Sequence, residues 1–212
     1  MGTIRKGING GFSGKVGNVS GMNWRGMSVV RSLPQKSNKP PTAKQLEQRL
    51  RFGCVTQFLT PVCPLLQQYF GEPDGVRSRR NLAISYHVRE AVTGTYPDLQ
   101  VDYPKVVLTM GHLPGVQQPV ITSLANAAFE ISWLDNSAQG QARATDTLLV
   151  VLYNEAKKEF KWVNEAARGE ESFVVHTDVS WSGDVVHCWL SFCALVGSRC
   201  SVGFYGGGVL AV

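Results

Sequence analysis

The chain has 212 residues, of which 43% are hydrophobic and 17% are charged, a composition typical of a folded protein and not of a disordered one. Its isoelectric point near 9.0 is mild compared with the strongly basic domains of dedicated nucleic-acid-binding proteins. The longest apolar runs, such as residues 148–152, have the length of a strand, which excludes a membrane-spanning helix of roughly 20 residues.

The N-terminus and the cysteines favour a reducing compartment. No apolar stretch follows the first charged residues, so we expect no signal peptide and a soluble, cytoplasmic product without a membrane partner. An odd number of cysteines without a CxxC pair predicts reduced and mostly buried thiols. The five are Cys54, Cys63, Cys188, Cys193 and Cys200.

Positive charge is concentrated at the start of the chain. Residues 1–51 contain ten Lys and Arg residues and one acid, Glu47, whereas the remaining 161 residues contain eleven basic and fifteen acidic ones. The formal charge of +5 is therefore the sum of a +9 arm and a −4 body. This asymmetry is typical of an arm that contacts a polyanion or an acidic partner surface.

Residues 7–33 read as β structure interrupted by glycines. Trp24, Arg25, Gly26 and Met27 predict a hairpin, because Gly tolerates the positive φ that tight turns require. So many glycines weaken strands unless close backbone contacts need them. We therefore expect this segment to pack on the body of the protein or on a neighbour.

Two helices are predicted after a Pro-bounded connector at residues 34–41. The first begins at Thr42, where Gln45 completes a capping-box pattern, and a short continuation is expected to reach Phe70. Its apolar stripe contains Leu46, Leu50, Cys54 and Phe58. The second helix is predicted at residues 79–92, with Gly94 as its C-cap and His87 facing solvent. Arg77, Arg79 and Arg80 form a candidate secondary basic patch at its start.

From about residue 103 the hydrophobic period changes from 3.6 to 2, which indicates strands. Seven are predicted, at residues 105–110, 129–133, 147–153, 159–163, 172–177, 185–195 and 200–205. Their number and spacing are typical of an immunoglobulin- or fibronectin-III-like β-sandwich, with Trp133 in its core. We thus expect an α+β protein: a Gly-rich basic hairpin and helical module at residues 1–100, and the sandwich at residues 101–212. The strand order is left open.

The N-terminal motif resembles a family. The string Gly10-Gly11-Phe12-Ser13-Gly14-Lys15-Val16-Gly17-Asn18-Val19, followed by Trp24-Arg25-Gly26, Arg31-Ser32-Leu33-Pro34 and Pro41-Thr42-Ala43-Lys44-Gln45-Leu46, is similar to an uncharacterised family of Bacteroidota proteins, a domain of unknown function. The resemblance spans nearly the whole chain. It implies that the two regions occur together as one architecture, and it implies no activity.

The residue spacings in the chain match no known motif for catalysis, cofactor binding or metal binding. The glycine string lacks G-x-x-x-x-G-K-[ST], because Val16 stands where a phosphate-binding loop needs Ser or Thr. His187 and Cys188 point to opposite faces of a strand, and the cysteine spacing matches no usual zinc pattern. Asp135 and Asp146 could supply oxygens to Ca²⁺, although a turn is the favoured interpretation. We expect no catalytic, cofactor-binding or metal-binding residues, and no cofactor.

The basic arm therefore gives the leading functional hypothesis. We expect a non-enzymatic structural or interaction protein whose arm assembles with another protein subunit or with another copy, in a setting such as a phage-like or mobile-element particle. The candidate partner-docking residues are Trp24, Arg25, Arg31, Lys15 and Phe12. The alternative is a nucleic-acid-binding accessory protein that uses the same arm. A solvated positive face that only balances the acidic body is also kept open.

Overall fold

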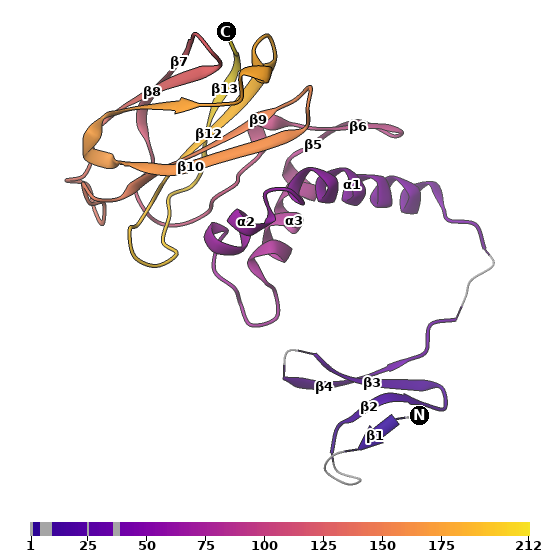
Figure 1. Cartoon of the computed structure of the whole chain (residues 1–212). Helices are drawn as coiled ribbons and strands as arrows, with labels where there is room; N and C mark the ends of the chain where they lie inside the picture. Colours follow the sequence, from indigo (N-terminus) through magenta and orange to yellow (C-terminus); the bar gives the residue numbers. More distant parts are fainter. Residues whose placement is uncertain (1, 5–9, 25, 36–38) are drawn as a thin grey trace. The chain divides into compact units, whose positions relative to one another are not determined.

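The computed structural model describes residues 2–4, 10–24, 26–35 and 39–212, and the chain forms two compact units, Met1–Ala43 and Lys44–Val212. Figure 1 shows the elements of both units along the chain. The division after Ala43 differs from the predicted domain boundary after residue 100. Its physical reason is a shared core between the helices and the sandwich, described below.

The first unit is a four-stranded antiparallel sheet in the order β1-β2-β3-β4. Its strands are β1 (Gly2–Ile4), β2 (Phe12–Val16), β3 (Val19–Trp24) and β4 (Met27–Ser32). The predicted hairpin is present, because Trp24 pairs with Met27 and Gly26 between them has a φ of +83°. The side chain of Asn23 accepts a hydrogen bond from the Gly26 amide at 2.9 Å and closes the turn.

The second unit begins with three helices where two were predicted. They are α1 (Ala43–Leu59), α2 (Cys63–Tyr69) and α3 (Arg79–Glu90). The expected continuation of the first helix is the separate helix α2, which has Pro64 in its first turn. Ser78 caps α3 by accepting a hydrogen bond from the Asn81 amide at 3.3 Å. The described helices include none long and apolar enough to cross a membrane.

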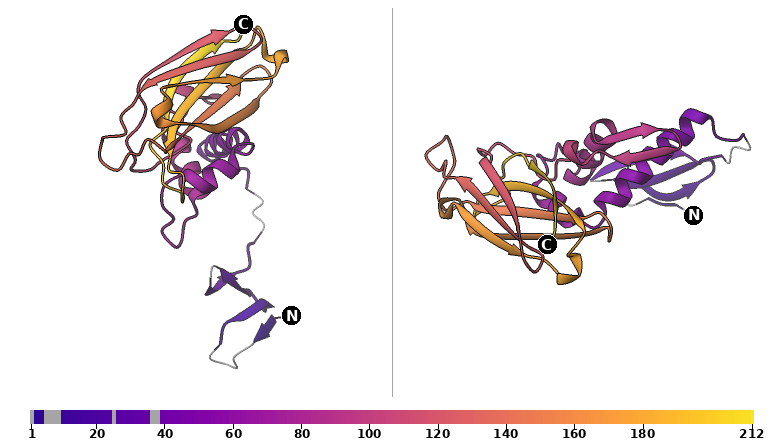
Figure 2. Two further views of the ribbon diagram at one scale, coloured as in Figure 1. Left: turned by 60° about the vertical axis from the view of Figure 1, so that its left-hand side comes forward. Right: turned by 90° about the horizontal axis from the view of Figure 1, so that it is seen from above.

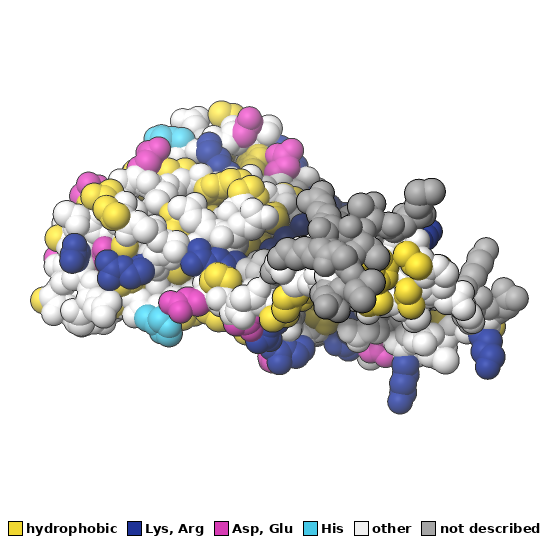
Figure 3. Space-filling view, turned by 90° about the horizontal axis from the view of Figure 1, so that it is seen from below, with side chains coloured by type: hydrophobic (Ala, Val, Ile, Leu, Met, Phe, Trp, Pro, Cys, Tyr) yellow, Lys and Arg dark blue, Asp and Glu magenta, His cyan; other side chains and the backbone are white. Residues whose placement is uncertain are grey.

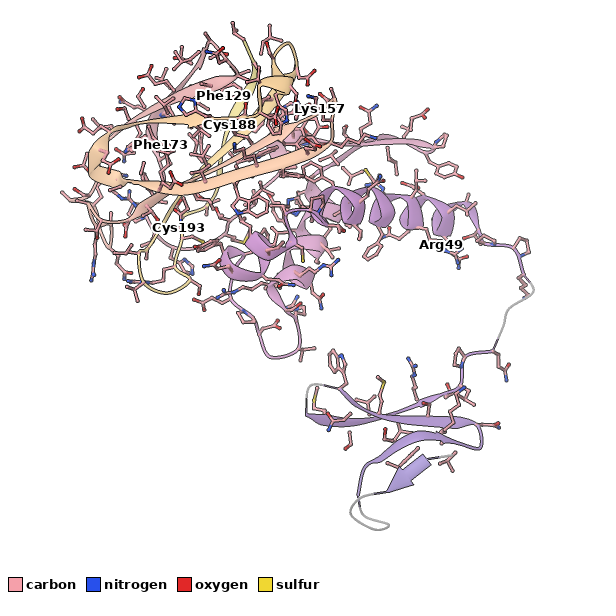
Figure 4. The ribbon with its side chains drawn as sticks, in the orientation of Figure 1. Arg49, Phe129, Lys157, Phe173, Cys188 and Cys193 are labelled. Carbon is pink, nitrogen blue, oxygen red and sulfur yellow. The ribbon has the colours of Figure 1, made fainter. Side chains whose placement is uncertain are left out.

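Only the C-terminal part of α1 joins the core. Val55, Phe58 and Leu59 are buried, whereas Leu46 and Leu50 in the predicted apolar stripe are exposed. Figure 4 labels Arg49 on this exposed part of α1. The predicted stripe therefore has the correct period but extends too far toward the N-terminus of the helix.

Two predictions for the region around α3 are wrong. His87 is 1% exposed and not solvent-facing, because its ring fills a space beside Phe70 and Tyr86. Gly94 is not a helix cap: α3 ends at Glu90, and Gly94 lies in a hairpin that was not predicted, formed by β5 (Val92–Thr95) and β6 (Asp98–Val101).

Seven antiparallel strands form a sandwich of two sheets, as predicted. The four-stranded sheet has the order β10-β9-β12-β13 and the three-stranded sheet has the order β11-β8-β7. The strands are β7 (Gln117–Leu124), β8 (Ala128–Leu134), β9 (Thr147–Asn154), β10 (Glu159–Ala167), β11 (Ser172–His176), β12 (Val185–Cys193) and β13 (Phe204–Leu210). The protein is thus α+β, with an immunoglobulin- or fibronectin-III-like sandwich.

Two of the seven predicted strands differ from the structure. Residues 105–110 begin at the end of a short 3-10 turn and form no named strand, and among them only Met110 forms an isolated bridge, to Phe70. The strand β7 was missed because it contains Pro119, which sits at a register shift on the edge of its sheet. The last strand begins at Phe204 and not at residue 200.

The two central strands of the four-stranded sheet, β9 and β12, are buried on both faces. Along β9, Leu148, Val150 and Leu152 pack between the two sheets, whereas Leu149, Val151 and Tyr153 pack against the helices. The second unit therefore has three layers: helices, four-stranded sheet and three-stranded sheet (Figures 1 and 2). This shared central sheet is why the contacts do not divide at residue 100.

The strand β12 shows the same alternation. In Figure 4, Cys188 lies with Phe129 and Phe173 between the sheets, and Cys193 lies on the side of the helices. Trp133, predicted as a core residue, is buried in the cluster between the two sheets.

Candidate functional site

The described part of the N-terminal sheet has no hydrophobic core of its own. Among its residues whose exposure the structure describes, 10–24, 26–35 and 39–43, only Gly21 is buried. The exposed large apolar side chains are Val16, Val19, Met22, Trp24, Met27 and Val30. Figure 3 shows hydrophobic side chains at the molecular surface next to Lys and Arg side chains. A sheet this small needs a packing partner for at least one face, because an isolated one is marginal in water.

Strand register assigns three predicted docking residues to one face. Trp24 pairs with Met27 and Met22 pairs with Val29, so these four side chains share a face. Arg31 pairs with Ser20 two residues further along, and Ser20 pairs with Lys15 on β2. We call this set the tryptophan face: Lys15, Ser20, Met22, Trp24, Met27, Val29 and Arg31.

The predicted docking residue Phe12 lies apart from this set. Gly14 pairs with Gly21, and Phe12, two positions before Gly14, points to the same side as both. Ring carbons of Phe12 lie 2.7 Å from where a Cβ on Gly21 would stand. Phe12 therefore fills the space above Gly21 within the sheet. Arg25, the remaining predicted docking residue, lies outside the described residues.

The charge of the N-terminal unit is entirely positive. Residues 1–43 contain seven Lys and Arg residues and no Asp or Glu, whereas residues 44–212 contain fourteen basic and sixteen acidic ones. On the tryptophan face, Lys15 and Arg31 lie on either side of Ser20, at one end of the apolar residues. The face thus combines an apolar centre with a basic end.

The three arginines of the secondary basic patch have different surroundings. Arg77 binds Asp74 through both guanidinium and backbone, and these hydrogen bonds lower the pKa of the Asp74 carboxyl. Arg79 donates to the Gln68 carbonyl and to Ser198 Oγ, the latter at 3.0 Å. Arg80 lines a shallow hollow together with Arg79 and Ser78.

Arg79 also lines a second pocket, together with Arg199 and His112. Sequence reasoning missed both of these residues. They lie in separate loops, and no local pattern relates residues 79, 112 and 199.

His187 and Cys188, which were considered as metal ligands, have structural partners. The ring of His187 stacks on Tyr103 at 4.0 Å between centroids and shares a hydrogen bond with the Tyr205 hydroxyl at 2.8 Å. Cys188 packs in the core between the sheets, on the opposite face of β12. Within the described part of the chain, no group of three His, Cys, Asp or Glu residues is arranged to hold a metal ion.

The candidate Ca²⁺ oxygens are occupied by protein donors. Asp135 accepts hydrogen bonds from the amide and hydroxyl of Ser137, as expected of a turn. Asp146 accepts from Arg168 at 3.2 Å, and Arg168 also donates to the Asn136 side chain. Arg168, which sequence reasoning did not single out, supplies the positive charge that a cation would bring.

The chain belongs to a family of unknown function, DUF6266, whose family model matches residues 11–207. No curated protein matches it at a significant level. Among solved structures it is similar to the fn3 domain of human collagen alpha-1(XX) chain, with 10% identity, a TM-score of 0.37, and coverage of 48% of this chain and 87% of that one. The fn3 domain of human contactin 1 has 8% identity, a TM-score of 0.35, and coverage of 48% and 81%.

Proposed function

We propose that the protein is a non-enzymatic structural or interaction protein, and that the tryptophan face of its N-terminal sheet docks onto another copy of the same chain. One observation supports this most: the sheet is folded, yet all its large apolar side chains in the β2–β4 region are at least partly exposed. Covering Met22, Trp24 and Met27 would remove apolar surface from water, which is the main driving force of association.

Charge supports a second copy as the partner. The N-terminal unit has seven basic residues and no acid, and the rest of the chain has an excess of acid. A basic sheet on one copy therefore complements the body of the next, and Lys15 and Arg31 orient the contact. A head-to-tail contact of this kind generates rings or filaments, which suits an assembly role.

The free edge of the sheet adds a second means of contact. The strand β4 lies at the edge of the sheet order and has six residues, none of them Pro or Lys. An extended segment of the partner can add to such an edge through main-chain hydrogen bonds, while side chains such as Trp24 supply specificity.

The test compares the two faces of the sheet in the full chain. Sedimentation velocity is expected to show self-association that weakens with salt and is lost in Trp24→Ala/Met27→Ala. The matched control is Val19→Ala/Val30→Ala, which removes exposed apolar groups from the opposite face and should leave the association unchanged. A wild-type protein that stays monomeric, or equal effects of both double variants, would contradict the proposal.

The alternative function is nucleic-acid binding by the same sheet, favoured by its wholly positive charge. Fluorescence anisotropy with labelled single-stranded and duplex DNA would then show an affinity that falls steeply with salt and is removed by Lys15→Glu/Arg31→Glu. Absence of binding at low salt rejects this alternative.

A further inference from the structure

A pocket of about 640 Å³ lies in the second unit, where loops from the helices and from the sandwich meet. It is formed by the loop between α2 and α3, the start of α3, residues 110–113, the β8–β9 loop and the β12–β13 loop. Its volume falls within the range of small-ligand sites, and junctions between substructures are where such sites tend to occur. The described residues that line it include none from the tryptophan face.

Backbone hydrogen bonds join the segments that line the pocket. The Gly71 amide donates to the Met110 carbonyl at 2.8 Å, and the Leu113 amide donates to the Cys200 carbonyl at 3.0 Å. A Cβ on Gly111 would stand 2.1 Å from that same Cys200 oxygen, so the two segments approach as closely as glycine allows. The loops are thus fixed to one another and do not form a chance surface depression.

Two arginines from distant parts of the sequence converge on this pocket. Arg79 is held in place by the Gln68 carbonyl and by Ser198, and its buried Nε has no hydrogen-bond partner among the described residues. Arg199 lies within 3.5 Å of the Gln141 side-chain oxygen. In the described part of the chain, no carboxylate lies within 4.0 Å of either guanidinium.

The described lining of the pocket therefore carries a net positive charge. Among these lining residues Glu72 is the one acid, against Arg79 and Arg199, and His112 adds a further nitrogen donor or acceptor. Guanidinium groups bind carboxylates and phosphates through paired N–H groups, in a geometry that lysine does not reproduce.

We propose that this pocket binds a small oxyanion-bearing ligand, a phosphate or a carboxylate, between Arg79 and Arg199. Arg79 is the preoriented contact, because its two fixed hydrogen bonds leave its remaining N–H groups available. Arg199 closes the site from the β12–β13 loop. This site shares no residue with the tryptophan face, so either proposal can fail without the other.

Isothermal titration calorimetry on the full-length protein tests the site with two probes, inorganic phosphate and citrate, at constant ionic strength. Binding of phosphate alone assigns a phosphate ligand, binding of citrate alone assigns a carboxylate ligand, and binding of both assigns their shared chemistry. Absence of binding for both probes at about 10 mM overturns the proposal.

Single substitutions locate the binding. Arg199→Gln is expected to weaken affinity about ten-fold or more, and Arg199→Lys to recover only part of it. Arg79→Gln should weaken it further, and circular dichroism checks that this variant folds. Arg77→Gln is the matched control, since Arg77 lies outside the pocket and pairs with Asp74. Affinity that Arg199→Gln leaves unchanged overturns the proposal, whatever Arg79→Gln does.

Discussion

The guanidinium of Arg168 lies 3.2 Å from Oδ2 of Asp146, and the exposed fraction of the two side chains is 0% and 3%. The carbon at the centre of the same guanidinium stands 3.7 Å from the ring centroid of Phe192. Arg168 also donates to the Pro114 carbonyl at 3.2 Å, so it joins three loops at one end of the sandwich. Burial lowers the pKa of Arg168, and the Asp146 charge opposes that shift. Each charge therefore depends on the other.

Removal of one member of this pair should be costly. Arg168→Met leaves Asp146 buried without its cation, and we expect the free energy of unfolding to fall by about 3–5 kcal/mol in urea titrations. The double variant Arg168→Met/Asp146→Leu removes both charges and should recover much of that loss. A loss below about 1 kcal/mol for the single variant would show that the pair is not structurally important.

Buried His87 makes stability depend on pH. Its Nδ1 lies 2.8 Å from the Ala83 carbonyl and its Nε2 accepts from the Val107 amide at 3.3 Å, which fits the neutral ring. Burial lowers the pKa of His87 below its usual value. The unfolded chain then binds the proton more tightly than the folded one, so stability is full above about pH 6.5 and falls as the pH drops below it.

The measurement is urea unfolding between pH 7 and pH 5. His87 contributes at most about 1.4 kcal/mol per pH unit to the slope of the free energy of unfolding against pH. His87→Gln should remove this contribution and so make the slope shallower. Identical slopes for wild type and His87→Gln would contradict the burial of His87.

Two glycine substitutions should act in opposite directions. Gly53 lies inside α1 with nothing within 4 Å of where a Cβ would stand, so Gly53→Ala should raise the free energy of unfolding by up to about 1 kcal/mol. Gly111→Ala should lower it, because the new Cβ meets the Cys200 carbonyl at 2.1 Å. Thermal unfolding of both variants checks the signs, and stabilisation by Gly111→Ala would contradict the close approach.

The buried cysteines should resist thiol reagents. Burial raises the pKa of Cys193 to about 12 and that of Cys200 to about 11. Their thiolate fractions at pH 8 are then about one in a thousand or less. With Ellman's reagent, the native protein should titrate at most the two partly exposed thiols, Cys54 and Cys63, and all five should react in urea. Cys63→Ser should leave at most Cys54 reactive in the native protein and should lower the number of thiols that react in urea by one.

Much of the sandwich could be predicted, because short apolar stretches bounded by turn residues indicate strands. The predicted β8, which alternates, and the predicted β9 and β12, which are continuous apolar runs, agree closely with the structure. The strand β7 was not predicted, because proline usually argues against a strand. In the structure Pro119 lies at a register shift in an edge strand, where proline is tolerated. The run of glycines at 206–208 likewise concealed the extent of β13.

The third layer and the pocket could not be predicted in the same way. The continuous apolar run of β9 is typical of a strand buried on both faces, but it does not say which segment of the chain covers the second face. Nothing local relates Arg79 to Arg199, or Arg168 to Asp146, because their contacts depend on loop positions set by the whole fold. On the N-terminal sheet, pairing register placed Trp24, Lys15 and Arg31 together and set Phe12 apart, a distinction that composition cannot make.

The central position of β9 and β12 has a consequence for how the second unit unfolds. Each strand contributes side chains to both clusters, so neither cluster can lose its packing without exposing the back of the other. Amide hydrogen exchange should therefore give β9, β12 and the C-terminal turns of α1 similar protection, as one cooperative unit. A fragment cut at residue 101 would leave Leu149, Val151 and Trp189 facing water, and would aggregate rather than behave as an autonomous module.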